Sequence, residues 1–136
     1  MAWYSKYLSI YEKPFSEVPD DVIISTREHL AAMQSDNPLV SIVVIAYNEG
    51  KRLTACLWSL SELQTSYPIE ILGVNNNSKD DTEEVYKALG VRYFNEMRQS
   101  PGFARQCGLD NSKGKYHFFI DADTFYPPHY VDTMMQ

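Results

Sequence analysis

The sequence predicts an α/β fold in which a mainly parallel sheet is flanked by helices. Two observations favour this class. From residue 38 onward, short apolar runs alternate with segments of helical periodicity, and the first of these runs is almost entirely β-branched. Strands that alternate with helices require right-handed crossovers, which place helices on both faces of a parallel sheet. We therefore expect a sheet of four strands, which we take to have the doubly wound order 3-2-1-4.

Residues 1–37 form a polar, aromatic-rich leader, which we expect to be a helical segment preceding a domain of residues 38–136. Pro19, Asp20 and Asp21 predict a helix that runs to about Met33, because acidic residues favour the positive end of a helix. Its apolar face is only moderately regular, which favours packing on the main domain over contact with a partner or membrane surface. The leader's scattered aromatic residues are expected to cover the core or a dimer contact.

The first strand and helix of the main domain follow the leader. Val40–Ala46 is a continuous apolar run of the kind that is buried on both faces of a parallel sheet. After Gly50, leucines recur at helical spacing and predict a helix that ends before Pro68: Leu53, Leu57, Leu60 and Leu63.

The same alternation continues to the end of the chain. Residues 69–74 predict a second strand, and Ser78 with Asp81 resembles the capping box of a helix that Gly90 ends. Three segments then predict a third strand, a third helix and a fourth strand: residues 91–94, 103–109 and 116–120. Pro127 and Pro128 open a last helix.

Ligands of such sheets bind beyond the carboxyl ends of the strands, where the strand order reverses. In the order 3-2-1-4, this point lies between the first and the fourth strand. The topology therefore predicts that residues 47–49 lie beside Asp121-Ala122-Asp123.

Composition and charge exclude several classes of function. The 136 residues suit one domain, and the net charge of −6 without a basic element argues against a nucleic-acid-binding protein. Cys56 and Cys107 lack metal-type spacing, so we expect reduced core cysteines of a cytoplasmic protein. No apolar run could cross a bilayer and residues 1–11 lack a signal-peptide core. We expect a soluble fragment, with membrane association of a longer parent protein left open.

Asp121-Ala122-Asp123 is the strongest candidate for a metal site, although nine aspartates give such a triplet little weight by itself. It follows an apolar strand directly, and desolvated carboxylates are costly unless a cation or hydrogen bonds stabilise them. Mg²⁺ and Mn²⁺ take oxygen ligands and share them with substrate phosphates. The motif alone leaves a metal site and an exposed acidic turn equally open.

Three other positions each have a structural and a functional interpretation. Asn75–Ser78 suits a turn and helix start, and its amides also suit the edge of a base. Tyr47 could be a boundary aromatic or a stacking platform for a base. Arg105 could be a solvated charge or a partner for phosphate.

Four segments in order resemble the family 2 glycosyltransferases of GT-A fold. They are VSIVVIAYNE at 40–49, ILGVNNNSKDDT at 71–82, GFARQ at 102–106 and KGKYHFFIDADT at 113–124. The resemblance covers about the last hundred residues. It implies a Rossmann-like domain that binds a nucleotide-diphosphate sugar, most often a UDP-sugar. The sugar would pass with inversion to a hydroxyl of an unknown glycan or lipid-linked acceptor.

The resemblance also implies substrate-binding roles for Ala46, Tyr47, Glu49, Asn76, Arg105, Asp121 and Asp123. By similarity, the first three border the base and ribose, Asn76 meets the uracil edge, and Arg105 lies near the base or diphosphate. Asp121 would contact the ribose or sugar. Asp123 would ligate a divalent metal, Mn²⁺ or Mg²⁺, that bridges the diphosphate.

The sequence departs from the family pattern at three points. Asn75, Asn76 and Asn77 replace an acidic pair and a glycine, and Gln106 replaces an asparagine. The chain also ends at Gln136, before the half that carries the acceptor pocket and catalytic base in this family. We therefore assign the base to no residue here and expect the fragment to be inactive.

Two alternatives stay open at the level of sequence. One is a non-catalytic nucleotide-binding or oligomerisation module with a degenerate donor site. In such a module, the leader helix would assemble partners, for example in a homodimer. The other is a nucleotidyltransferase, which would normally carry a glycine-rich basic loop after the first strand. Residues 47–50 are a poor version of that loop.

Overall fold

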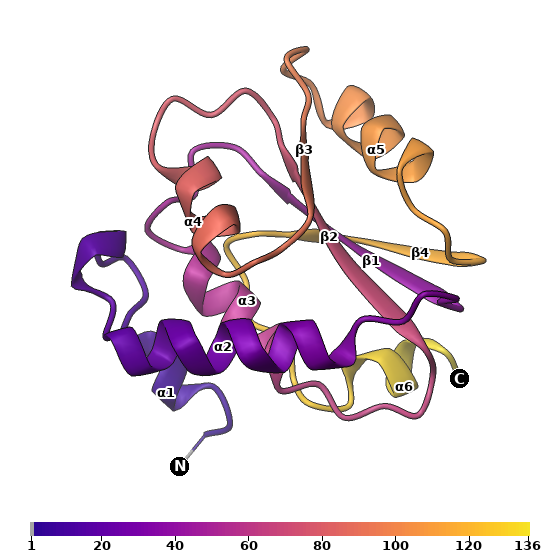
Figure 1. Ribbon diagram of the computed structural model, residues 1–136, viewed down its shortest axis with the longest axis horizontal. Helices are drawn as coiled ribbons and strands as arrows, with labels where there is room; N and C mark the ends of the chain where they lie inside the picture. Colours follow the sequence, from indigo (N-terminus) through magenta and orange to yellow (C-terminus); the bar gives the residue numbers. More distant parts are fainter. Residues whose placement is uncertain (1) are drawn as a thin grey trace.

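A computed structural model describes residues 2–136, and its centre is one four-stranded parallel sheet (Figure 1). The strands lie in the order β3-β2-β1-β4, which confirms the predicted order. In chain order they are β1 (Val40–Ala46), β2 (Ile69–Asn75), β3 (Tyr93–Asn95) and β4 (Tyr116–Asp121).

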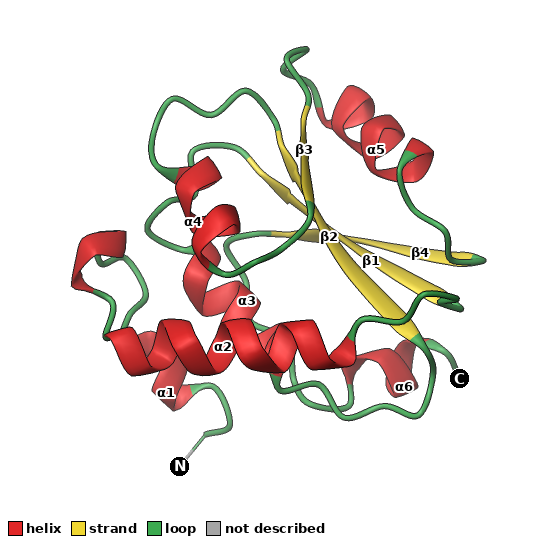
Figure 2. Cartoon of the chain, viewed as in Figure 1, coloured by secondary structure: helices red, strands yellow, loops and turns green. Residues whose placement is uncertain are grey.

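Helices cover both faces of the sheet, with α5 alone on one side of it (Figure 2). The helices are α1 (Ser5–Leu8), α2 (Asp20–Met33), α3 (Leu53–Ser61), α4 (Thr82–Ala88), α5 (Pro101–Asp110) and α6 (Tyr130–Met134). A 3-10 turn, Phe15–Glu17, precedes α2. Among residues 2–136, no helix is long and apolar enough to cross a membrane.

The residues of β1 alternate between two apolar layers because successive side chains of a strand point to opposite faces. Ile42 and Val44 belong to the larger core, which also includes Leu30 of α2 and Leu57 of α3. Val43 belongs to a smaller cluster beneath α5. This two-sided burial explains the continuous apolar run that predicted the strand.

Glycine allows α5 to approach β1 closely. A Cβ atom built at Gly108 would lie 2.5 Å from Cγ1 of Val43, closer than carbon atoms can pack. The absence of a side chain at Gly108 therefore sets the position of α5 on the sheet. Arg105 and the residues before the helix are positioned by the same contact.

Several expected boundaries differ from the structure: α3 ends at Ser61, before Leu63, and α6 begins at Tyr130, after Pro127 and Pro128. Two further differences have a clear physical reason. Helix α4 begins at Thr82, and Ser78 makes no side-chain cap; its hydroxyl instead accepts a hydrogen bond from the Asn48 backbone N–H at 2.9 Å. β3 begins at Tyr93, because the Val91 N–H closes the turn after α4 by donating to the Tyr86 carbonyl at 3.0 Å. The first difference arises from a tertiary contact, whereas the second arises from a local turn in which Gly90 has a φ of 68°.

The leader packs on the outer surface of α3. Tyr7, Ile10 and Val18 form a buried cluster with Ala55 of α3, and Leu30 of α2 lies in the main core. The leader helix α2 thus covers part of the apolar surface of the sheet domain. Of the two cysteines, Cys56 is buried in the core and Cys107 is half-buried, and both are free.

Candidate functional site

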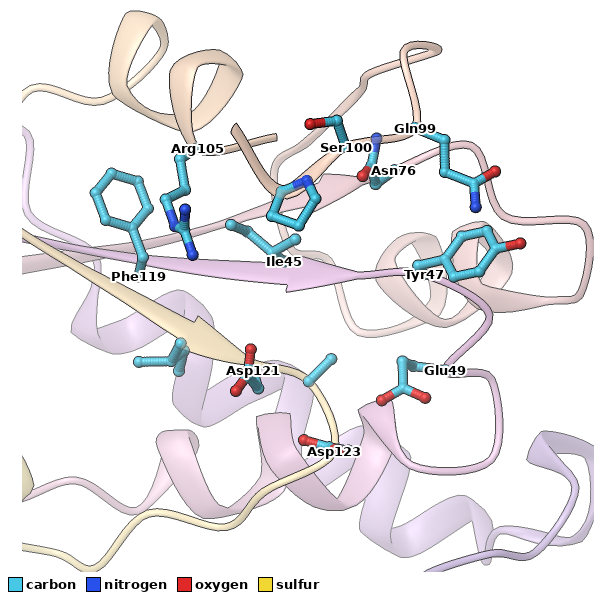
Figure 3. A pocket seen from close by; sticks show the side chains of 13 residues that line it. Ile45, Tyr47, Glu49, Asn76, Gln99, Ser100, Arg105, Phe119, Asp121 and Asp123 are labelled. Carbon is cyan, nitrogen blue, oxygen red and sulfur yellow. The ribbon is translucent and has the colours of Figure 1, made fainter. Parts of the chain in front are cut away.

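A cavity of about 450 Å³ opens at the carboxyl ends of the strands, between β1 and β4 (Figure 3). This is the point where the strand order reverses, as the topology predicted. The cavity is lined by Ile45, Tyr47, Glu49, Asn76, Gln99, Ser100, Pro101, Arg105, Phe119, Ile120, Asp121, Ala122 and Asp123. Six of the seven predicted binding residues therefore meet in one cavity.

Ala46 is the seventh predicted residue, and it does not line the cavity. Its side chain is 1% exposed within the core. Its backbone carbonyl accepts a hydrogen bond from the Asn76 N–H at 2.8 Å, which joins the end of β1 to the loop after β2. Any contribution of Ala46 to the site is therefore made through the position of Asn76.

The loops after β1 and β2 are tied together by side-chain hydrogen bonds to backbone N–H groups. Asn48, which has a left-handed backbone with φ 53°, accepts from the Lys79 N–H through its side chain at 2.8 Å. Thr82 accepts from the Glu49 N–H at 2.9 Å, and Asp80 accepts from the Gly50 N–H at 3.0 Å. These bonds fix the backbone that presents Tyr47 and Glu49.

Asn76 is held in one orientation by its own amide group. The side chain is 4% exposed, and its Nδ2 donates to the carbonyl oxygens of Glu96 and Arg98 at 3.0 and 2.9 Å. A reversed amide would point Oδ1 at two carbonyl oxygens, which would repel it. Since both amide hydrogens are used, the group that Asn76 offers the cavity is its oxygen, a hydrogen-bond acceptor.

Asp121 ends β4, and Asp123 lies in the turn that follows the strand. Both aspartates are exposed, whereas Ala122 between them is 1% exposed. The Tyr126 hydroxyl accepts from the Asp121 N–H at 3.2 Å and lies 3.3 Å from the Asp121 carbonyl, to which it donates. The buried alanine and this tyrosine anchor the turn, so both carboxylates face the cavity.

The carboxylates of Glu49, Asp121 and Asp123 lie on one side of the cavity, opposite Asn76 and Arg105 (Figure 3). Burial raises the pKa of Glu49, and the negative charge of Asp123 raises it further. Arg52 opposes this shift through an ion pair in which Nη1 lies 2.6 Å from Glu49 Oε1. One wall of the cavity is thus acidic and partly desolvated, a setting in which a cation is favourable.

Arg105 projects from α5 into the cavity and makes no salt bridge within residues 2–136. Its guanidinium group is therefore available to an anion such as a phosphate. The sequence did not predict that Gln99, Ser100 and Pro101 line the cavity. A signal for them existed, since Ser followed by Pro marks a helix start.

The acidic wall fits a divalent cation only with help from a ligand. Within the described part of the chain, no group of three or more His, Cys, Asp or Glu side chains could hold an ion alone. Asp123 presents an exposed carboxylate, and one of its oxygens accepts from the Thr124 hydroxyl at 3.1 Å. This hard oxygen donor suits Mg²⁺ or Mn²⁺ when phosphate oxygens complete the coordination.

The order of the strands and the helices on both faces of the sheet are those of the GT-A fold. A sequence model of the family described as glycosyl transferase family 2 matches residues 41–136. The chain belongs to this family, which favours the glycosyltransferase interpretation over the nucleotidyltransferase alternative.

Curated relatives agree with this assignment. An uncharacterized glycosyltransferase of Rickettsia prowazekii is 35% identical over 98 residues, which cover 71% of this chain and 30% of the relative. Glycosyltransferase AglE of Haloferax volcanii is 31% identical over 100 residues, covering 67% of this chain and 32% of the relative. The chain thus spans about a third of the length of these relatives.

Solved structures share the fold. TarS of S. aureus, solved in complex with UDP, has a TM-score of 0.60 at 24% identity and matches 71% of this chain and 31% of its own. The mannosyltransferase PcManGT of Pyrobaculum calidifontis, with GDP-Man and Mn²⁺, has a TM-score of 0.60 at 16% identity, over 91% and 40%. Glucosyl-3-phosphoglycerate synthase of Mycobacterium tuberculosis, with Mg²⁺ and UDP, reaches 0.55 at 23% identity, over 78% and 39%.

Proposed function

We propose that this chain supplies the donor and metal site of an inverting glycosyltransferase that uses a UDP-sugar. The observation that carries the proposal is the cavity at the reversal of strand order, which gathers an amide acceptor, a free guanidinium and three carboxylates. The match to glycosyl transferase family 2 and the UDP complexes of two structural neighbours support it.

Asn76 supports uracil as the base. Uracil presents an N–H donor at the edge where cytosine presents a ring-nitrogen acceptor. The Asn76 oxygen faces the cavity while its NH₂ group is held by two carbonyl oxygens. An acceptor in a fixed orientation therefore favours uracil. The Asn76 oxygen thus offers the base an acceptor, as the carboxylate of the aspartate in the family pattern would. Tyr47, which is exposed beside the cavity, is our proposed stacking surface.

Asp123 and Arg105 divide the recognition of the diphosphate between them. Asp123 would hold the divalent metal, and when bound the metal would act as a Lewis acid that stabilises the departing diphosphate. Arg105 would pair with a phosphate oxygen from the opposite side of the cavity. Asp121, the last residue of β4, lines the same cavity and would orient the ribose or sugar.

The reaction follows from this placement of the donor. An acceptor hydroxyl would attack the anomeric carbon on the face opposite the diphosphate, so that the configuration is inverted. The bond from the anomeric carbon to the diphosphate oxygen breaks with its electron pair moving to that oxygen. We assign the base that removes the hydroxyl proton to no residue of this chain.

Thermal unfolding tests the proposed donor site. UDP with Mn²⁺ at about a hundred times Kd should raise the Tm by roughly 10 °C, because only the folded chain binds it. Asp123→Ala should remove the part of this rise that depends on Mn²⁺. Asp36→Ala is the matched control. Asp36 is exposed and lies just before the start of β1, at the end of the strand away from the cavity. No rise with any nucleotide diphosphate and metal would refute the proposal.

A further inference from the structure

The leader reaches the candidate site through one short segment, residues 7–12, which includes the end of α1. The Tyr11 hydroxyl donates a hydrogen bond to the backbone carbonyl of Asp123 at 3.0 Å. These two residues are 112 positions apart in the sequence. The leader therefore touches the backbone of the residue that is our proposed metal ligand.

Aromatic packing holds the same loop from a second direction. The ring of Phe125 lies between those of Tyr7 and Tyr11, with centroid distances of 5.6 and 5.2 Å. Tyr7 is itself fixed against Trp58 of α3 at 5.1 Å, and its hydroxyl donates to the Glu62 carboxylate. The Tyr126 N–H also donates to the Ser59 hydroxyl of α3 at 3.1 Å, so the loop after β4 contacts both the leader and α3.

A third contact runs from the leader to the acidic wall. Nε of Arg52 lies 2.5 Å from Glu12 Oε1, while its Nη1 lies 2.6 Å from Glu49 Oε1. The Glu12 N–H also donates to the Lys51 carbonyl at 3.0 Å. Glu12 therefore orients the guanidinium that holds Glu49 at the cavity.

We propose that residues 7–12 position the donor site, with Tyr11 as a positioning residue that acts through the Asp123 backbone. The proposal rests on the function proposed above, because it gives Asp123 the metal. A carboxylate in an exposed turn must be ordered when it binds a metal, and a turn that is already fixed loses less entropy on binding. The Tyr11 hydrogen bond supplies part of that order before the ligand arrives.

The test compares Tyr11→Phe with Tyr4→Phe in the full chain. Phenylalanine keeps the ring that packs on Phe125 and removes only the hydroxyl. Tyr4 is an exposed leader tyrosine whose hydroxyl makes no hydrogen bond within residues 2–136, so it is the matched control. Titration calorimetry would measure the Kd of UDP with Mn²⁺ and with EDTA. Hydrogen exchange would measure the peptide 121–126 in the ligand-free protein.

We expect Tyr11→Phe to weaken the binding of UDP with Mn²⁺ about fivefold, which is the worth of one hydrogen bond. Binding with EDTA should stay unchanged, and the Tm of the free protein should fall by about 3–5 °C at most, because the lost hydrogen bond is already present in the free chain. A merely structural role would weaken UDP binding equally with and without Mn²⁺. The peptide 121–126 should exchange faster. Tyr4→Phe should match the wild type in every measurement.

Two outcomes would overturn the proposal: an unchanged metal-dependent Kd in Tyr11→Phe, or unchanged exchange of the peptide 121–126. Failure of the proposed function has a different signature, since the wild type itself would then bind no UDP with Mn²⁺. In that event the exchange data still decide whether the leader fixes the loop. The two failures are therefore distinguishable.

Discussion

Asn76 shows how one side chain can depend on neighbours that are distant in sequence. Its NH₂ group donates to two carbonyl oxygens, those of Glu96 and Arg98. Asn76→Asp restores the residue type of the family pattern, yet it should lower the free energy of unfolding by about 2–4 kcal/mol. The new carboxylate would face two carbonyl oxygens at a position that is 4% exposed.

Chemical denaturation of Asn76→Asp beside Asn77→Asp would measure this effect. Asn77 is half-buried with a φ of 64°, a conformation that Asp also adopts, so its variant should stay close to the wild type. Equal stability of the two variants would show that the Asn76 amide is not held as described.

Asp80 gives a prediction for pH dependence. Burial raises its pKa, but hydrogen bonds from the Thr82 hydroxyl and the backbone N–H groups of Gly50 and Thr82 lower it more, so the net pKa lies below 3.8. A carboxyl group whose pKa is lower in the folded state than in the unfolded state stabilises the fold at pH values above its unfolded-state pKa. This stabilisation is lost as the pH falls through the folded-state pKa. Asp80→Ala should therefore lower the free energy of unfolding at neutral pH, by less than about 1 kcal/mol because Asp80 is exposed and solvent screens its charge.

Denaturation of the wild type and Asp80→Ala across a pH series would test this sign. The difference in stability should be constant between about pH 5 and 8 and should shrink below pH 3.8. A difference that grew with acidity would contradict the hydrogen-bonding role of the Asp80 carboxylate.

At the scale of elements, helix α5 depends on its close approach to β1. Gly108→Ala should lower the free energy of unfolding by about 1–3 kcal/mol, because its Cβ would overlap Val43. The shift of α5 should also displace Arg105 and weaken UDP binding. Gly102→Ala lies in the same helix with its Cβ 3.7 Å from Ser100 Oγ, so it should be neutral or stabilising.

The two glycine variants, measured by denaturation and by UDP titration, form a matched pair. If Gly108→Ala were as stable as Gly102→Ala and bound UDP equally well, the contact between α5 and β1 would not set the position of Arg105.

Elements with a strong hydrophobic period were predictable from the sequence, and the boundaries set by tertiary contacts were not. The apolar run of β1 and the leucines of α3 predicted those two elements directly. The handedness of crossovers predicted helices on both faces of the sheet, and the strand order was expected from the doubly wound pattern of such sheets. Ser78 looked like a cap because the spacing fits, but its hydroxyl is taken by Asn48 across the site. The short α1 has no period long enough to detect.

The candidate site followed from topology to the extent that strand ends define it. Tyr47, Glu49, Asp121 and Asp123 meet because β1 and β4 are parallel neighbours. The orientation of Asn76 and the hydrogen bond from Tyr11 depend on long-range packing, for which no local pattern exists.

At the scale of the whole molecule, the leader and the sheet domain share buried surface. Deletion of residues 1–37 removes four buried apolar side chains, those of Tyr7, Ile10, Val18 and Leu30. Each is worth about 1.5–3 kcal/mol, and their sum is comparable to the 5–15 kcal/mol that stabilises a typical domain. We expect the deleted protein to lose its cooperative unfolding transition in circular dichroism.

Deletion of residues 1–4 is the control for this experiment, because Trp3 and Tyr4 are exposed. It should melt close to the wild-type temperature. A cooperative transition at that temperature after deletion of residues 1–37 would show that the leader is dispensable for the fold.

The central claim is that Asp123 holds a divalent metal together with a nucleotide diphosphate. The most direct measurement is electron paramagnetic resonance of Mn²⁺, which distinguishes free from bound ion, with UDP alone as the baseline. With UDP present, the wild-type chain should bind one equivalent of Mn²⁺ beyond the amount that UDP binds without protein. Without UDP, the chain should bind none. Asp123→Asn should leave only the signal of Mn²⁺ with UDP alone. Equal Mn²⁺ binding by the two proteins would contradict the claim.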